Sequence, residues 1–225
     1  MAFWFDHQPG DQRVTTVLLI FASACALAYM PMAPKPVSTA RTFFKTASVG
    51  TLAVIAVFSG APLLLSTALA LCAIGDALLS RETDQTFMAG IGAFAAGHLA
   101  YIALFLTHPS SDPGLIWERP AMFWSLIVLG IIAATLLTPR AGDLKGPVLA
   151  YIPIILGMGI AVLTLPDTDA LWLALPAALA FIASDLILAT EKFLLPPNHP
   201  SRKVTPYPIW ILYWGAQVGL LLAFA

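Results

Sequence analysis

The chain has 225 residues, of which 59% are hydrophobic and only 10% are charged. Because soluble domains carry about 25% charged residues, this composition excludes a soluble protein and indicates an integral membrane protein. The formal net charge of −1 gives no reason to expect a nucleic-acid partner. The two cysteines, Cys25 and Cys72, lie in apolar runs, which argues against a disulfide framework.

A membrane-spanning helix needs about 20 predominantly apolar residues. Eight stretches meet this requirement: 14–33, 42–60, 62–80, 87–107, 121–138, 146–165, 170–190 and 207–225. Short connections rich in Pro, Gly or charge separate most of them. We therefore predict an all-α polytopic membrane protein with eight transmembrane helices in a single domain, 1–225. The break at 59–62 is the thinnest, so a seven-helix alternative that fuses or drops one element stays open.

The basic residues predict how the helices are oriented. With eight spans, both termini lie on one side, and the connections of that side carry only Arg13 and Arg119. The other side carries Lys35, Arg41, Arg81, Arg140, Lys145, Lys192, Arg202 and Lys203. Because cytoplasmic loops are enriched in Lys and Arg, we expect both termini outside and the odd-numbered connections in the cytoplasm. The expected location is the bacterial inner membrane.

Two carboxylates stand inside predicted spans in similar surroundings. Asp76 lies in the segment IGDALLS, about 6 Å inside the cytoplasmic end of span three. Asp185 lies in the segment AFIASDLILATEKF, about 9 Å inside the same end of span seven. Ionisable groups in hydrocarbon are costly and are functional-site candidates by default. The matching phrases also indicate two copies of a four-helix unit, related as a parallel repeat.

Other polar side chains fall at comparable depths on different helices, as a shared cavity requires. They include a histidine and a tyrosine on one face of span four and a stripe on span eight. The predicted set around the two acids is Lys45, His98, Tyr101, Tyr151, Tyr213 and Gln217. We expect a polar chamber in the cytoplasmic half of the membrane. We predict interfacial positions for Trp4, Trp117, Trp172 and Trp210, and we expect Glu191 and Lys192 to be solvated.

Four segments resemble the YhhN family of membrane proteins, which includes the lysoplasmalogenases. They are GDALL at 75–79, AFAAGHLAYIALF at 93–105, ASDLILATEKF at 183–193 and YWGAQVGLLLA at 213–223. Their order and spacing fit the family over nearly the whole chain. The resemblance implies eight transmembrane helices. It also implies hydrolysis of the vinyl-ether bond of lysoplasmalogens to a fatty aldehyde and glycerophosphocholine or glycerophosphoethanolamine.

The resemblance also implies roles for particular residues. It marks Asp76 and Asp185 as the catalytic pair. It places His98, Tyr101, Tyr213 and Gln217 around them, and Lys45 at a basic position early in the second helix. The expected partners are a lysophospholipid substrate and membrane lipids, and the oligomeric state stays open.

Hydrolysis of a vinyl ether starts with protonation at carbon, which creates an oxocarbenium ion that water then captures. The enzyme needs one protonated acid and one negative group facing the cation. Two carboxylates in one apolar pocket suit this need because they resist ionising together. We therefore hypothesise that one of Asp76 and Asp185 donates the proton and the other stabilises charge or orients water. Lys45, with Lys192 or Arg81 at the rim, is expected to attract the phosphate.

Four other interpretations compete with this one. A metal hydrolase is disfavoured because His7, His108 and His199 fall in loops or at helix ends, so neither a metal nor a cofactor is expected. Ser184 lacks a nucleophile-elbow motif. A small transporter or lipid-binding protein would use the acids as a proton relay, but the outer half offers almost no polar lining. The acids could also cap helix ends or pair with Lys45 or Arg81 without doing chemistry.

Overall fold

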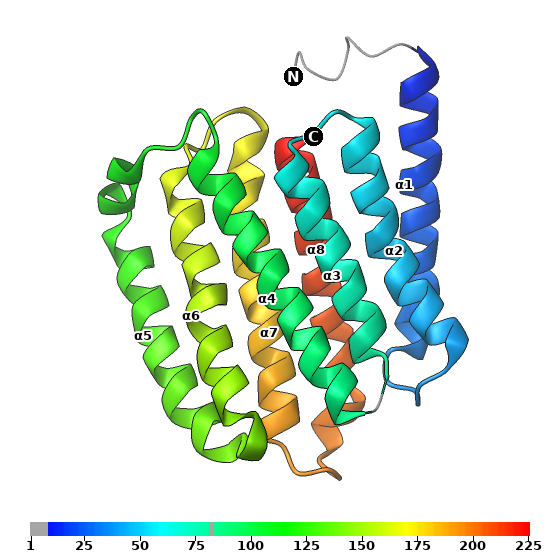
Figure 1. The fold of residues 1–225 in the computed structure, drawn as a ribbon, viewed down its shortest axis with the longest axis vertical. Coiled ribbons are helices and arrows are strands. Elements are labelled where there is room, and N and C mark those ends of the chain that lie inside the picture. The colour runs from blue at the N-terminus through cyan, green and yellow to red at the C-terminus, as the bar shows by residue number, and fades with distance from the viewer. Residues whose placement is uncertain (1–8, 82) are drawn as a thin grey trace.

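The computed structural model describes residues 9–81 and 83–225, so Trp4 and His7 lie outside the described residues (Figure 1). Within these ranges the chain folds into α-helices joined by short connections and 3-10 turns, with no strand. The helices are α1 (Pro9–Tyr29), α2 (Thr39–Phe58), α3 (Leu63–Leu79), α4 (Asp84–Thr107), α5 (Pro120–Leu137), α6 (Lys145–Ala161), α7 (Ala174–Phe193) and α8 (Pro206–Phe224). Seven of these described elements are long and apolar enough to cross a membrane, and α3 is shorter, at 17 residues. The predicted all-α polytopic fold is confirmed.

The thin break at 59–62 separates two real helices. Gly60 adopts a positive φ of 68°, a conformation open to glycine, and the chain reverses there. Pro62 is the N-cap residue of α3 and Ser80 is its C-cap residue. The Asp76 carbonyl accepts from both the Ser80 backbone N–H, at 3.1 Å, and the Ser80 hydroxyl, at 2.7 Å, which holds the end of the helix. The elements α2 and α3 are therefore distinct, as the eight-helix prediction requires.

The central helices carry the densest packing. In Figure 1, α1 and α5 lie at opposite edges, with α4, α7 and α8 between them. The most extensive helix contacts join α3 to α4 and α7 to α8. Glycine allows the first of these approaches: a Cβ added at Gly97 on α4 would lie 2.9 Å from the Cys72 sulfur on α3. The proposed parallel repeat is not tested by these contacts and stays a prediction.

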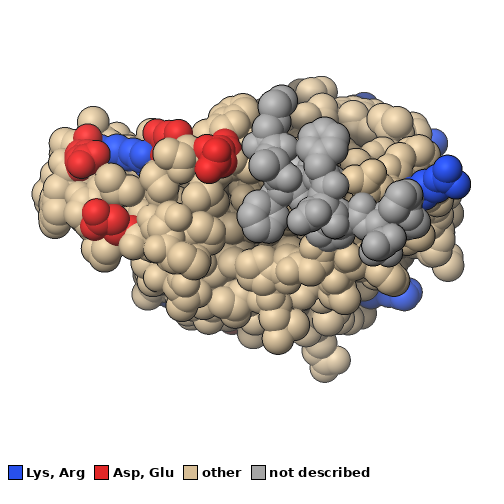
Figure 2. All heavy atoms as spheres, turned by 90° about the horizontal axis from the view of Figure 1, so that it is seen from above, with Lys and Arg blue, Asp and Glu red and all other residues tan. Residues whose placement is uncertain are grey.

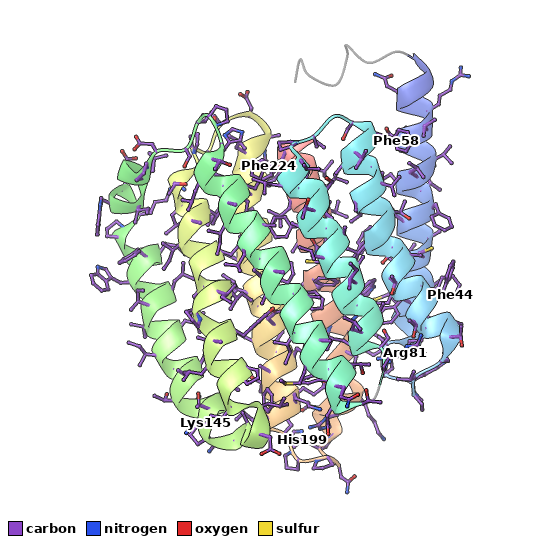
Figure 3. All side chains as sticks on the ribbon, in the orientation of Figure 1. Phe44, Phe58, Arg81, Lys145, His199 and Phe224 are labelled. Carbon is purple, nitrogen blue, oxygen red and sulfur yellow. The ribbon has the colours of Figure 1, made fainter. Side chains whose placement is uncertain are left out.

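The two ends of the helical bundle differ in charge. We call the end with Arg81 and Lys145 the basic end, and the opposite end, near Phe58 and Phe224, the terminal end (Figure 3). Figure 2 shows the terminal end, where acidic side chains gather on one side. The acids of the α4–α5 and α6–α7 connections are Asp112, Glu118, Asp167 and Asp169. This asymmetry has the form that the positive-inside rule describes, whereas orientation in a cell stays a prediction.

The outer faces of the edge helices are apolar. Leu27 on α1 and Ile131 on α5 are 71% and 60% exposed, which suits contact with lipid chains. Trp117 and Trp172 are also largely exposed, in the connections at the terminal end. Their positions agree with the predicted interfacial belt. Trp210 behaves differently and belongs to the site.

Candidate active site

A cavity of about 280 Å³ lies between the helices at the basic end. Asp76 from α3 and Asp185 from α7 both line it. Lys45 from α2, Tyr151 from α6 and Tyr213 from α8 line it as well. Five helices thus bring five of the eight predicted site residues to one chamber, and both acids are among them.

Asp76 is held entirely by donors. Its side chain is 0% exposed, and the Lys45 Nζ lies 2.9 Å from its Oδ1. The Tyr213 hydroxyl donates to its Oδ2 at 2.7 Å. An ammonium and a hydroxyl that both donate to a carboxyl group favour its ionised form. Of the non-catalytic alternatives, pairing with Lys45 is therefore present in the structure, and a buried ion pair of this kind also has a structural role.

Asp185 has a different set of partners. The Tyr151 hydroxyl donates to its Oδ2 at 2.5 Å. The Nε2 of His98 lies 3.9 Å from the same oxygen, and the Asp185 side chain is 15% exposed. No Lys or Arg of the described residues forms an ion pair with it. Of the two aspartates in the cavity, Asp76 therefore has a cationic partner and Asp185 has none among the described residues.

His98 is fixed in orientation by its own helix. Its Nδ1 lies 2.7 Å from the Phe94 carbonyl oxygen, which can only accept, so Nδ1 carries the hydrogen. The neutral ring then keeps its lone pair on Nε2, which is buried and has no hydrogen-bond partner within the described ranges. The ring packs edge-to-face on Phe181, with centroids 4.4 Å apart. His98 thus lies outside the cavity lining but turns an acceptor toward Asp185.

Tyr101 and Gln217 lie away from the cavity. Both are fully buried, and the Tyr101 hydroxyl donates to the Gln217 Oε1 at 2.5 Å. This bond joins α4 to α8 deeper in the bundle than the two acids. The two residues do not line the cavity, so the structure gives them a bridging position between helices.

Trp210 corrects one prediction from the sequence. It is only 3% exposed, and its Nε1 donates to the Ala26 carbonyl at 3.1 Å instead of lying in an interfacial belt. Its ring lies 4.4 Å from that of Tyr29, and both rings line the cavity. The Arg41 guanidinium sits 5.9 Å above the Tyr29 ring. Nothing in an apolar helix such as α1 distinguishes Tyr29 as a site residue before the helices are packed.

The mouth of the cavity adds to a second prediction. Lys192 is exposed, as predicted, and Glu191 is half-buried, and both side chains also line the cavity. The Thr205 hydroxyl donates to the Glu191 carboxylate. The Lys192 Nζ lies 4.4 Å from the centroid of the Phe87 ring. Arg81, which the sequence offers as a rim residue, is absent from the lining.

The cavity wall is amphiphilic. Its charged side chains come from α2, α3 and α7. Its remaining wall is apolar and includes Leu137 at the end of α5 and Val148, Ile152 and Ile155 on α6. The apolar residues of α5 and α6 thus face a lining that carries charged side chains from three other helices (Figure 1). Such a chamber suits a ligand with a charged head and an apolar tail.

Other catalytic arrangements find less support. In the described part of the chain, no three His, Cys, Asp or Glu side chains cluster as a metal site would require. The Ser184 hydroxyl donates to the Ile209 carbonyl at 2.9 Å, which engages it in joining α7 to α8. The carboxyl groups remain the side chains best placed for chemistry.

Comparison with known proteins adds one positive finding. The model of the YhhN family matches residues 40–224, a range that includes both acids and all six other predicted site residues. No curated protein and no solved structure matches the chain.

Proposed function

Because this chain belongs to the YhhN family, we propose that it is a membrane-embedded hydrolase that cleaves the vinyl-ether bond of lysoplasmalogens. The products are a fatty aldehyde and a glycerophospho-alcohol. The single observation that carries the proposal is the pair of differently partnered carboxyl groups in one amphiphilic cavity. Asp76 is paired with Lys45, and Asp185 has no cationic partner among the described residues.

The shape of the cavity supports a lysolipid substrate. Such a lipid has one apolar chain, a glycerol with a free hydroxyl and a phosphate-linked head group. The apolar wall around Ile152 and Ile155 suits the chain, and the polar wall suits the glycerol and the head group. Lys45 and Asp76 then lie on the polar side of the reacting bond.

Asp185 is the better candidate for the acid. A buried carboxylate without a counter-ion is costly, so the absence of a cationic partner favours its protonated form. Tyr151 occupies the Oδ2 atom, which leaves Oδ1 to carry the proton. In the proposed first step this proton moves to the vinyl carbon further from the ether oxygen. Positive charge then develops on the oxocarbenium group, and Asp185 becomes a carboxylate.

Asp76 supplies the permanent negative charge. Its bonds to Lys45 and Tyr213 favour its ionised form and fix its orientation, and the carboxylate can still interact with a developing cation. An ionised group preorganised near a developing cation lowers the barrier because it needs no reorganisation during the reaction. The arrangement parallels the carboxyl pair of glycosidases, which also face an oxocarbenium-like transition state.

The remaining steps restore the acid. Water attacks the oxocarbenium carbon and gives a proton to the Asp185 carboxylate, which leaves a neutral hemiacetal. Asp185 then protonates the glycerol oxygen as the carbon–oxygen bond breaks and takes up the hydroxyl proton of the hemiacetal. One water is consumed, one aldehyde and one alcohol are released, and Asp185 ends protonated.

The transporter alternative has less support in this structure. A transport route must continue from the cavity toward the terminal end. The side chains beyond Tyr101 and Gln217 are instead buried and apolar. They include Leu65, Leu104, Phe105 and Leu220. This packing favours a chamber that opens at one end only.

Replacement of each acid tests the proposal. We expect Asp185→Asn and Asp76→Asn each to lower aldehyde release from purified protein by about 10²–10⁴-fold, the usual contribution of acid–base catalysis. The matched control is Asp143→Asn, which changes an exposed carboxylate at the basic end and is expected to retain wild-type activity. Full activity in either cavity variant removes that residue from the mechanism.

A further inference from the structure

We propose that the mouth of the cavity selects a phosphoethanolamine head group over phosphocholine. In this assignment Arg41 and Lys192 bind the phosphate, and Glu191 binds the primary ammonium. The inference rests on the proposed lysolipid hydrolysis and names the head group that the same site prefers.

The three residues share one rim. Arg41 lies in the first turn of α2, and Glu191 and Lys192 lie in the last turn of α7, so all are at the basic end. All three side chains line the same cavity, and contacts made by α8 and the residue before it lie between the two helices. Glu191 bonds Thr205 just before α8, Trp210 on α8 packs against Tyr29, and Tyr29 lies under Arg41.

Arg41 has unused capacity for an anion. Its Nη2 donates to the Ala33 carbonyl at 3.3 Å, but its buried Nε has no hydrogen-bond partner in the described structure. No carboxylate of the described residues forms an ion pair with Arg41 or with Lys192. An arginine with free donors is a typical phosphate ligand, and Lys192 adds a second cation to the same cavity lining.

Glu191 has unused capacity for a cation. Its side chain accepts a bond from Thr205, and no basic side chain within the described ranges pairs with it. Its position is fixed because the Arg202 Nη2 donates to its backbone carbonyl at 2.5 Å and to that of Leu195 at 2.8 Å. A held carboxylate at the rim can accept N–H bonds from a primary ammonium. A trimethylammonium group has no N–H to donate.

Choline recognition would instead need open aromatic faces. Two aromatic rings of the lining, Phe87 and Tyr29, already have a protein cation over them. The Lys192 ammonium covers Phe87, with Nζ 4.4 Å from the ring centroid. Arg41 lies over Tyr29, and the Trp210 ring packs against the same tyrosine at 4.4 Å. Among the described residues, the mouth therefore offers the Glu191 carboxylate for N–H donors, whereas the faces of Phe87 and Tyr29 that could hold methyl groups already carry a lysine and an arginine.

The depth of the acids fits this placement. Glu191 and Asp185 are six residues apart on α7, or about 9 Å along the helix axis. Arg41 and Lys45 are four residues apart on α2, or about 6 Å. An extended phosphate–glycerol–ether segment spans about 6 Å with bonds near 1.5 Å. A phosphate at the rim thus brings the vinyl ether to the depth of the acids.

The test compares two alkenyl lysolipids that share one chain and differ only in head group. We expect wild-type kcat/KM for the ethanolamine lipid to exceed that for the choline lipid by about tenfold or more, the usual worth of a charge-assisted hydrogen bond. Glu191→Gln keeps an acceptor for Thr205, and we expect it to bring the ratio of the two values near one. Arg41→Gln should lower both values together. Arg81→Gln, outside the lining, is the matched control and should keep the wild-type values and ratio.

A second measurement needs no variant. Soluble glycerophosphoethanolamine should inhibit the wild-type enzyme at lower concentration than glycerophosphocholine does. Equal or choline-favouring rates and inhibition, or a wild-type ratio in Glu191→Gln, would overturn the head-group assignment and leave the hydrolase in place. Absence of aldehyde from both lipids would instead sink the proposed function itself.

Discussion

At the scale of single residues, two aspartates of the same chemistry stand in different electrostatic settings. Asp76 contacts an ammonium and a tyrosine hydroxyl, and Asp185 contacts a tyrosine hydroxyl and faces a histidine acceptor. Divergent surroundings are how one protein obtains both an acid and a base from identical side chains. The proposed mechanism depends on this difference more than on either residue alone.

The ion pair inside the bundle gives a prediction about stability. Lys45→Met leaves the fully buried Asp76 without its counter-ion, and we expect a loss of about 3–5 kcal/mol in the free energy of unfolding. Thermal unfolding in detergent micelles measures the loss. The double variant Lys45→Met with Asp76→Asn should recover part of it, because no charge is then buried unpaired.

The control for that experiment is Lys145→Met, which removes an exposed lysine at the same end and should change stability little. If the Lys45 and Lys145 variants unfold alike, the buried pair does not stabilise the fold as described.

The sequence predicted the positions of the key residues better than their partners. Helix depth placed Tyr151 and Tyr213 near the acids because it depends only on residue counts. The pairing of each tyrosine with its acid depends on how the helices are rotated and on which helices are neighbours. Local sequence patterns determine neither the rotation nor the neighbours. Tyr101 and Gln217 show the same limit, because they lie on the predicted faces but bond to each other away from the cavity.

At the scale of elements, the site depends on the close approach of α3 and α4. A Cβ added at Gly75, next to Asp76, would lie 2.6 Å from the Phe94 ring. That ring lines the cavity and packs edge-to-face on Tyr213, with centroids 5.7 Å apart. The missing side chain at Gly75 therefore sets the shape of the cavity wall.

Gly75→Ala tests this packing. We expect the added methyl to displace the Phe94 ring, to destabilise the protein by about 1–3 kcal/mol and to raise KM for the lysolipid. Gly92→Ala on α4 is the control, because nothing lies within 4 Å of its Cβ position and the change should be neutral or slightly stabilising. Equal unfolding temperatures for the two variants would contradict the assigned role of Gly75.

Helix boundaries illustrate what composition can predict. The apolar runs gave all eight helices because each must satisfy its own backbone in lipid. The ends shifted where local chemistry differs from hydropathy: α1 ends at Tyr29, and a 3-10 turn at Met30–Met32 with Pro31 follows it, whereas the apolar run continues to residue 33. Such shifts move boundaries without changing the order of helices.

At the scale of the whole molecule, charge distinguishes the two ends. The basic end holds the mouth of the cavity, and the terminal end carries the acidic connections shown in Figure 2. The positive-inside rule then predicts a site that opens to the cytoplasm. A lysolipid would enter with its head group on that side.

Site-directed labelling in cells tests the orientation. A membrane-impermeant maleimide should label Ser110→Cys at the terminal end in intact cells, and Lys145→Cys at the basic end only after permeabilisation. The native Cys25 and Cys72 are buried and should stay unlabelled in both cases. The opposite pattern would place the cavity mouth outside the cell.

The central claim is that an aspartic acid of this cavity protonates a vinyl-ether carbon, and the most direct test is hydrolysis in heavy water. The released aldehyde is reduced at once to the alcohol, and mass spectrometry measures how much deuterium the alcohol contains. The mechanism predicts one deuterium on the carbon next to the former carbonyl, and loss of this product in Asp185→Asn. Aldehyde without that deuterium, or wild-type labelling in the variant, would contradict the account.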